Sequence, residues 1–248
     1  YNFSIIKNKM TELNGVDYIG LSSSELHGRN FDQETSRSAV GQPIGSFFVY
    51  EADGLFQNDA EIQNYKNDKG ELLQPNAKPG DIRFKDLNGD GVINSEDRDF
   101  VGSPLPDCSM GLTLGFNYKN FDISAFFQGV FGNEVYNLTN YLGEFYNQAQ
   151  YNKNSTILDA WRPDHTNTDI PRVTLDDPNN NIRPSTYYIH NASFVRLKNL
   201  KIGYTLPDRI TSKLKLKRTY IYLQGQNLFT ITGYNGIDPE VGLQSYSS

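Results

Sequence analysis

The dominant pattern along this chain is an alternation of apolar and polar residues with a period of two. In 111–118 every second residue is a large apolar one, and the residues between are Gly, Thr and Asn. After Lys119-Asn120 the alternation returns in 121–131. Successive side chains of a strand point to opposite faces, so two such runs across a short Asn-containing turn predict a β-hairpin.

Four further strands are expected, at 2–6, 46–51, 194–205 and 219–228. Within 194–205 the apolar phase slips after Leu197, and a β-bulge near Lys198-Asn199 accounts for the slip. Helical periodicity is scarce. It supports two short helices, one at 59–65 with Asn58 or Asp59 as its N-cap, and one at 156–161, ending before Pro163.

Long segments rich in Asn, Asp, Gly and Pro separate these strands, roughly 52–108, 132–190 and 229–248. Connections in compact domains have a median of about 4–6 residues, so such segments count against a compact soluble β-domain. A transmembrane barrel has short turns at one rim and long loops at the other. No stretch approaches 18 consecutive apolar residues, which excludes a transmembrane helix but leaves strands that cross a membrane open.

Composition narrows the function classes. Aromatic residues make up 13% of the 248 residues, which argues against disorder. The formal net charge is −6 and we identify no Lys/Arg stripe, so nucleic acid is not an expected partner. Cys108 is the single cysteine and cannot form an internal disulfide or a cysteine-based zinc site.

One stretch has the spacing of a calcium loop of the D-x-N-x-D-G type, from Asp86 to Asp97. A glycine at its sixth position, Gly91, permits the sharp turn. Oxygen donors at this spacing suit a hard cation that takes 6–8 oxygen ligands. The expected structural Ca²⁺ would be held within loop 78–108 by Asp86, Asn88, Asp90, the Val92 carbonyl, Asn94 and Asp97.

The alternative is an acidic loop of Asx-turns without metal, because Asn, Asp and Gly favour turns for their own reasons. A true EF-hand is disfavoured. Lys78-Pro79-Gly80 would break an incoming helix, and Ile82-Arg83-Phe84 has the character of an extended segment. At its twelfth position the loop has Asp97 where the motif usually has a bidentate Glu.

No catalytic motif is present. His27, His165 and His190 are widely spaced, and neither a nucleophile elbow nor a phosphate-binding glycine motif occurs. We therefore predict that the chain is not an enzyme. Aromatic residues of the long segments could stack on a sugar or peptide, or could pack within the loops or at a membrane interface: Tyr141, Phe145, Tyr146, Tyr151, Trp161, Tyr187 and Tyr188.

Several stretches, in this order, resemble the C-terminal part of SusC/RagA-type TonB-dependent outer-membrane transporters. They are Val40–Phe48, Tyr50–Gln57, Pro79–Asp86 continuing through the calcium-like loop, Val101–Pro104, Gly115–Asn137, Leu197–Pro207, Gln224–Thr230 and Gly233–Glu240. The calcium-like loop alone is a moderate signal, and the ordered set is a specific one.

The resemblance implies an all-β fold of antiparallel transmembrane barrel strands with long extracellular loops, residues 1–248 being one part of a longer barrel without its plug domain. Members of this family import oligosaccharides or peptides across the outer membrane of Gram-negative bacteria. They work with a SusD-like surface lipoprotein, as a possible dimer of such pairs, and draw energy from TonB through the plug. The expectation is thus a piece of an importer that needs the rest of its barrel.

On this interpretation Leu112, Leu114, Phe116 and Tyr118 face lipid, whereas Thr113 and Asn117 face the lumen. The alternative function is a secreted calcium-binding β-sandwich that binds glycans. It explains the strands, the aromatic residues and the calcium-like loop, but not the long loops or the ordered family motifs. A sandwich would be soluble on its own, while a barrel segment would need detergent.

Overall fold

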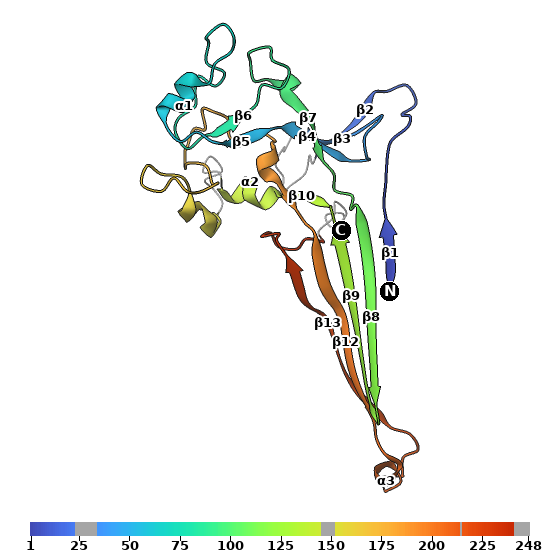
Figure 1. Cartoon of the computed structure of the whole chain (residues 1–248). Helices are drawn as coiled ribbons and strands as arrows, with labels where there is room; N and C mark the ends of the chain where they lie inside the picture. Colours follow the sequence, from blue (N-terminus) through green and yellow to red (C-terminus); the bar gives the residue numbers. More distant parts are fainter. Residues whose placement is uncertain (23–33, 145–151, 214, 241–248) are drawn as a thin grey trace. The chain divides into compact units, whose positions relative to one another are not determined.

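The computed structural model of the chain describes residues 1–22, 34–144, 152–213 and 215–240. It confirms the all-β prediction, since antiparallel strands predominate and the helices are short (Figure 1). The chain forms two compact units. Unit 1 comprises Tyr1–Lys7, Leu105–Glu134 and Asn191–Ser248, and unit 2 comprises Asn8–Pro104 and Val135–His190.

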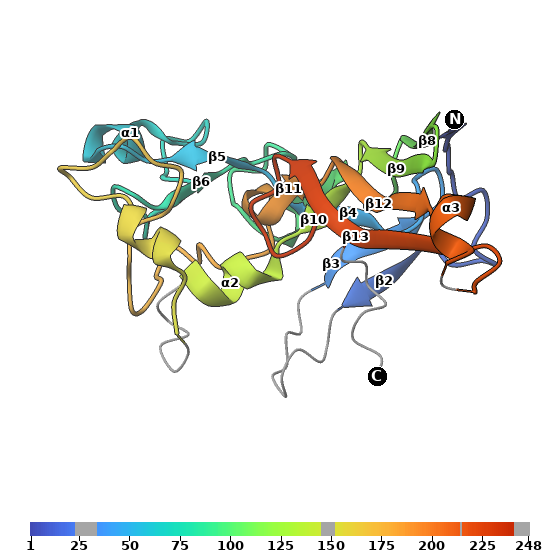
Figure 2. The same cartoon turned by 90° about the horizontal axis from the view of Figure 1, so that it is seen from below.

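Unit 1 is built on one open antiparallel sheet of five strands in the order β1-β8-β9-β12-β13. Its four long strands have 11, 11, 12 and 13 residues and run side by side in both views (Figures 1 and 2). The bounds are Asn2–Ile5 for β1, Cys108–Tyr118 for β8, Phe121–Phe131 for β9, Phe194–Thr205 for β12 and Tyr220–Thr232 for β13.

The predicted hairpin and the predicted bulge are both confirmed. Tyr118 pairs with Phe121, so Lys119 and Asn120 form a two-residue turn, and Lys119 takes the left-handed conformation with φ 52°. The register of β12 shifts between Leu197 and Asn199, on both of its neighbours. Strand β13 continues to Thr232, so the prediction that it ends at 228 was too short.

Unit 2 contains a four-stranded sheet in the order β2-β3-β4-β7 and a small pair of strands, β5 and β6. The bounds are Tyr18–Ser22 for β2, Glu34–Ala39 for β3, Ser46–Tyr50 for β4, Ala52–Leu55 for β5, Ile82–Phe84 for β6 and Arg98–Gly102 for β7. A further short pair, β10 (Glu134–Tyr136) and β11 (Ile189–Asn191), forms where the chain passes between the units.

Helices are few and short. In the described part of unit 2 they are α1 (Asp59–Asn64), α2 (Leu138–Glu144) and the 3₁₀ turns η1 (Ser95–Asp97), η3 (Ser155–Asp159) and η4 (Thr186–Tyr188); the described part of unit 1 has α3 (Asp208–Thr211). The Asn58 side chain accepts a hydrogen bond from the Glu61 N–H and caps α1, as predicted. The helix expected at 156–161 is instead the shorter 3₁₀ turn η3.

No helix of the described residues is long and apolar enough to span a membrane.

The hydrophobic core of unit 2 is formed largely by residues from the segments predicted to be long loops. Its buried members are Leu55, Ile82, Phe84, Tyr141, Trp161, Ile182 and Tyr188. Tyr188 is fully buried, and its ring lies 5.4 Å from that of Tyr136 and 5.8 Å from that of Tyr141. These segments therefore fold into a packed body with short strands of its own, which the sequence pattern did not predict.

Candidate functional site

The predicted calcium loop connects β6 to β7 and is folded as a series of side-chain-capped turns. Both carboxylate oxygens of Asp86 accept backbone hydrogen bonds, one from Gly89 at 2.8 Å and one from Gly91 at 2.9 Å. Gly91 has φ 87°, the left-handed conformation for which its position was singled out. The first aspartate of the motif thus holds the turn that the glycine makes possible.

Four of the six predicted ligands converge. The Asp90 Oδ2 accepts hydrogen bonds from Asn88 Nδ2 at 3.2 Å and from Asn94 Nδ2 at 3.3 Å. Asn94 Nδ2 also reaches the Val92 carbonyl at 3.3 Å. The two amide nitrogens thus meet at the Asp90 carboxylate, while the Asn88 and Asn94 oxygens accept the backbone N–H groups of Asp90 and Glu96. Side-chain and carbonyl oxygens are the ligand types that Ca²⁺ prefers, and to bind it the two amides would have to turn their oxygens toward the ion.

Asp97 is placed differently from the other five. Its side chain is fully buried, and its oxygens accept hydrogen bonds from the backbone N–H groups of Leu87 at 2.9 Å and Asn94 at 2.7 Å. Together with Asn94 it forms a capping box on η1. Asp97 therefore fastens the two ends of the loop to each other through the backbone.

Glu96 is a neighbour of the loop that sequence reasoning did not select. Its Oε2 lies 3.5 Å from Asn88 Nδ2, which brings a further carboxylate to the converging group. The motif template assigns no ligand to this eleventh position, so only the fold could reveal it. Among the described residues, no group of three or more His, Cys, Asp and Glu side chains is placed to hold a metal, so a cation in this loop would need amide and carbonyl oxygens as ligands.

A second polar cluster in unit 2 is buried and fully paired. Asp81 is completely inaccessible and accepts hydrogen bonds from Arg172 Nε at 2.6 Å and from Asn181 Nδ2 at 3.0 Å. Asn181 Oδ1 accepts the Ile82 N–H at 2.8 Å, and Gln74 Oε1 accepts the Phe84 N–H at 2.8 Å. Because these side chains satisfy the backbone of β6, the cluster is structural and holds the start of the calcium-like loop in place.

The aromatic residues considered as ligand contacts are mainly core residues. Tyr141, Trp161 and Tyr188 are buried, so they contribute to packing and not to an exposed stacking surface. Tyr187 is half-buried and donates a hydrogen bond to Glu144 at 2.6 Å. Phe145, Tyr146 and Tyr151 lie outside the described residues.

Glu144, at the end of α2, is a buried carboxyl group. Burial raises its pKa, although hydrogen bonds from Tyr187 and from Thr156, the latter at 3.2 Å, act in the opposite direction. The same burial raises the pKa of Tyr187 far above its ordinary value. The pair connects α2 to η3 and η4 and lies next to a cavity of about 180 Å³ lined in part by Leu55, Asp169 and Tyr187.

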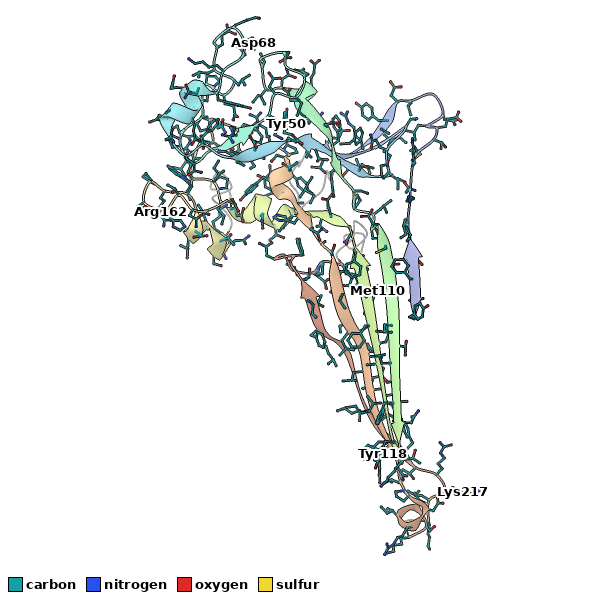
Figure 3. The ribbon with its side chains drawn as sticks, in the orientation of Figure 1. Tyr50, Asp68, Met110, Tyr118, Arg162 and Lys217 are labelled. Atoms are coloured by element: carbon teal, nitrogen blue, oxygen red, sulfur yellow. The ribbon has the colours of Figure 1, made fainter. Side chains whose placement is uncertain are left out.

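Unit 1 presents the other candidate site, which is a surface. In register across the sheet, the large apolar residues of adjacent strands fall on one face: Leu112 lies opposite Phe127, Phe116 opposite Ile123, and Ile123 opposite Ile202. Many of these side chains are exposed, with Leu114 at 53% and Phe116 at 60%. Figure 3 shows β8, which carries Met110 and Tyr118, running along this sheet.

The opposite face of the sheet is polar, apart from a few residues such as Phe126 and Val130. Asn117, Asp122 and Gly203 are in register there, and the Tyr220 hydroxyl donates to Asp122 at 2.7 Å. Toward the other end, Arg196 is buried and pairs with Asp238 and Glu240, both at 2.6 Å. Burial raises the Asp238 pKa, but the hydrogen bonds from Arg196 and the Glu240 N–H, together with the charges of Arg196 and Lys198, outweigh burial, so the Asp238 pKa is lowered.

Comparison with known proteins shows extended similarity to two bacterial receptors. The chain is 37% identical over 245 residues to TonB-dependent receptor P3 of Formosa agariphila, and 30% identical over 246 residues to TonB-dependent receptor SusC of Bacteroides thetaiotaomicron. These matches cover 99% and 97% of this chain. Over almost its whole length, the chain is similar to one part of these TonB-dependent receptors.

The matched region is 23% of receptor P3 and 22% of SusC, so the chain spans about a quarter of the length of these relatives. Among solved structures, the RagAB peptide importer in its open-open state aligns with a TM-score of 0.67 and 25% identity, covering 94% of this chain and 23% of that one. A second structure, of the RagAB peptide transporter, aligns with a TM-score of 0.67 and 27% sequence identity. No family model matches the chain.

These similarities confirm the predicted resemblance to SusC/RagA-type proteins, and the RagAB structures share the antiparallel β fold of this chain. The relatives named here are receptors and importers and not enzymes, in agreement with the prediction that the chain is not an enzyme. The calcium site stays a prediction.

Proposed function

We propose that this chain forms part of the wall and outer loops of an outer-membrane TonB-dependent importer. The observation that carries the proposal is the exposed apolar face of four adjacent strands of 11–13 residues. Strands of about 9–11 residues, tilted, cross a bilayer, and barrel strands alternate apolar-outward with polar-inward side chains. In water, a continuous apolar surface of this kind would be a liability.

The sheet also fits a barrel because its polar face is the one that would line the lumen. The Arg196 ion pairs and the Asp122–Tyr220 hydrogen bond lie on that face, where water is available to polar groups. The sheet is open, and hydrocarbon does not tolerate unpaired strand edges. Edges β1 and β13 therefore pair with further strands of the same barrel in the proposed importer.

The finer parts of the proposal rest on the relatives. The TonB-dependent receptors support energy supply through TonB, and the RagAB peptide importer supports peptides as cargo. A SusD-like lipoprotein partner, TonB contact through a plug, and oligosaccharides as the other cargo class follow from the resemblance to SusC/RagA-type transporters. We place the importer in the outer membrane, with unit 2 among its extracellular loops. A dimer of importer–lipoprotein pairs is part of the same proposal.

The alternative, a soluble β-sandwich that binds glycans, is disfavoured by the same sheet. In a sandwich a second sheet covers the apolar face, with the two sheets about 10 Å apart. Here the described residues leave Leu114, Phe116 and Leu223 at least half exposed.

The test is the mass and behaviour of the native polypeptide that contains this chain. On a denaturing gel of the membrane fraction, boiled and unboiled, we expect a heat-modifiable band several times larger than the 28.1 kDa of this chain. A water-soluble product of 28.1 kDa that runs identically with and without boiling would contradict the proposal.

For the loop 86–97 we propose a structural calcium site held by Asp86, Asn88, Asp90, Val92 and Asn94, with Asp97 closing the loop from behind. Extracellular calcium modules bind with Kd values of about 10⁻⁴–10⁻³ M, so external calcium would fill even a weak site. Its role would be to stiffen the loop between β6 and β7, because a bound cation replaces the weak amide contacts to Asp90.

Calcium titration tests this site. Hydrogen exchange of residues 86–97 should slow as calcium is added to the chelator-treated importer, and Asp90→Asn should weaken the response about tenfold or more because a charged ligand is lost. Asp68→Asn, an exposed aspartate outside the loop, is the matched control. If the exchange rate does not change with calcium, or if Asp90→Asn responds as the unmodified protein does, the proposed calcium site is wrong. The loop is then a series of Asx-turns without a metal.

A further inference from the structure

The connection between β12 and β13, residues 206–219, differs in charge from the rest of this net-acidic chain. We refer to it as the basic connection. It carries five basic residues and one acidic residue, Asp208, and so contains the Lys/Arg cluster that the overall charge concealed. The basic residues are Arg209, Lys213, Lys215, Lys217 and Arg218.

The described structure of the basic connection leaves these five side chains exposed and outside any ion pair with a described residue. Basic residues elsewhere are commonly paired, as Arg172 is with Asp81 and Arg196 with Asp238. Ile210 and Leu216 are exposed among the free cations, at 43% and 49%. The surface is therefore both cationic and apolar.

The sheet fixes where this surface lies. The basic connection begins directly after Thr205 and ends directly before Tyr220, at the same end of the sheet as the two-residue turn at Lys119. Hydrogen bonds join the two connections, since Thr205 N–H donates to the Asn120 carbonyl at 2.8 Å and Asn120 Nδ2 donates to the Thr205 carbonyl at 2.8 Å. Figure 3 shows Tyr118 near the end of β8 and Lys217 beyond it.

Aromatic side chains collect at this end of the apolar face. Tyr118 and Phe121 face each other across the turn, both more than half exposed, and the Phe121 ring lies 4.5 Å from that of Tyr204. Girdles of aromatic residues mark the level of the membrane interface in barrels. In the proposed barrel, residues immediately beyond this girdle, including the basic connection, would lie at the depth of the lipid headgroups.

We propose that the basic connection binds the headgroups of anionic phospholipids at the turn-side face of the membrane, with Ile210 and Leu216 dipping into the interface. A cluster of free cations near a phosphate surface gains attraction from each added Lys or Arg, and an adjacent apolar residue adds buried area. The connection thereby anchors this rim of the barrel. This inference rests on the proposed membrane function.

The experiment uses the complete importer that contains this chain, reconstituted into bilayers of equal parts phosphatidylcholine and phosphatidylglycerol. Trace spin-labelled lipid of either kind reports how strongly the protein retains each. We expect the protein to retain spin-labelled phosphatidylglycerol about threefold or more over phosphatidylcholine. The triple change Lys213→Gln, Lys215→Gln, Lys217→Gln should bring this retention ratio close to one. Salt should weaken the preference of the unmodified protein in the same direction.

The matched control removes the same charge elsewhere. Lys66, Lys69 and Lys78 of unit 2 are exposed and make no ion pair with a described residue, so Lys66→Gln, Lys69→Gln, Lys78→Gln should keep the preference. Heat-modifiability on a gel confirms that each variant still forms a barrel. If a variant does not form a barrel, the salt titration of the unmodified protein tests the inference instead, because an electrostatic preference for phosphatidylglycerol must weaken as salt is added.

No preference for phosphatidylglycerol, or a preference that survives the triple change or high salt, would overturn the inference. That result would leave the barrel in place, because immobilised lipid of both kinds would still be seen. A protein that immobilises neither lipid would instead contradict the proposed membrane function, so the two failures are distinguishable.

Discussion

The two units of this chain are stabilised in opposite ways. In unit 1 the backbone ladder of five strands carries the structure, and large apolar side chains such as Leu114 and Phe116 remain exposed. In unit 2 a cluster of large apolar side chains is buried, and Phe84 and Tyr188 are fully inaccessible. Buried side chains accept hydrogen bonds from the irregular backbone of unit 2, among them Asp81 from the Lys78 N–H and Asn181 from the Ile82 N–H. In the proposed importer, this contrast places unit 1 in an apolar surrounding and unit 2 in water.

The largest expected effect comes from breaking the buried polar cluster around Asp81 in unit 2, which should leave the five-stranded sheet of unit 1 intact. Asp81→Ala leaves Arg172 and Asn181 without their acceptor, and breaking a buried ion pair costs about 3–5 kcal/mol. Amide exchange of Ile82 and Phe84, whose N–H groups depend on Asn181 and Gln74, should accelerate more than a hundredfold, while the β8–β9 ladder keeps its protection. Asp68→Ala, at an exposed position, should change neither. If amide exchange accelerated equally in both units, the two units would not be stabilised independently of each other.

The next effect tests which face of the sheet meets lipid. Leu114→Arg should destabilise the barrel by about 2–4 kcal/mol, because a cation near the bilayer midplane is costly on the lipid side. Thr113→Arg, one residue away on the opposite face, should cost much less. Heat-modifiability and urea unfolding of the reconstituted importer measure both. Equal costs at the two positions would contradict the assignment of the faces.

A smaller effect concerns the pH dependence of unit 2. The folded-state pKa of Glu144 is raised above its ordinary value of 4.5 by burial, so its neutral form is favoured in the folded state. Stability from this group is full below pH 4.5 and is lost as the pH rises through the raised value. Glu144→Gln should remove this dependence from the local stability around η3 and η4, as measured by hydrogen exchange against pH.

The control for that change is Glu61→Gln. The Glu61 carboxylate accepts a hydrogen bond from the Gln57 N–H just before α1, at an exposed position. It should leave the pH profile at η3 and η4 unaltered. A profile that Glu144→Gln does not change would assign the pH dependence to another group.

Sequence reasoning predicted the sheet of unit 1 far better than the body of unit 2. Strand β9 and strand β12 were predicted to the residue, because alternation with a period of two is a local property of the chain. The bulge after Leu197 was also visible as a phase slip. Strands β2 and β3 were missed, since Glu34–Ala39 is a polar run with three residues, such as Ser36, buried only by tertiary contacts.

Burial of the loop aromatics could not be predicted for a related reason. Tyr141 and Trp161 lie in segments without periodicity, and they are buried because residues more than 50 positions away, such as Leu55 and Ile82, pack against them. The calcium-like loop was located from its motif, but the roles within it were not. The fold of η1 determines those roles. It directs the Asp97 carboxylate to backbone N–H groups, from which it accepts hydrogen bonds, and it brings Glu96 close to Asn88.

The most direct test of the central claim is residue-by-residue accessibility along β8. Single cysteines at positions 112–118, in an importer with Cys108→Ser, would carry spin labels whose collisions with oxygen and with a water-soluble nickel complex are compared. We predict an alternation with a period of two, in which labels at Leu112, Leu114 and Phe116 collide with oxygen in lipid, and labels at Thr113 and Asn117 collide with nickel in water. Uniform access of the nickel complex to both sets would contradict the claim that this sheet faces lipid.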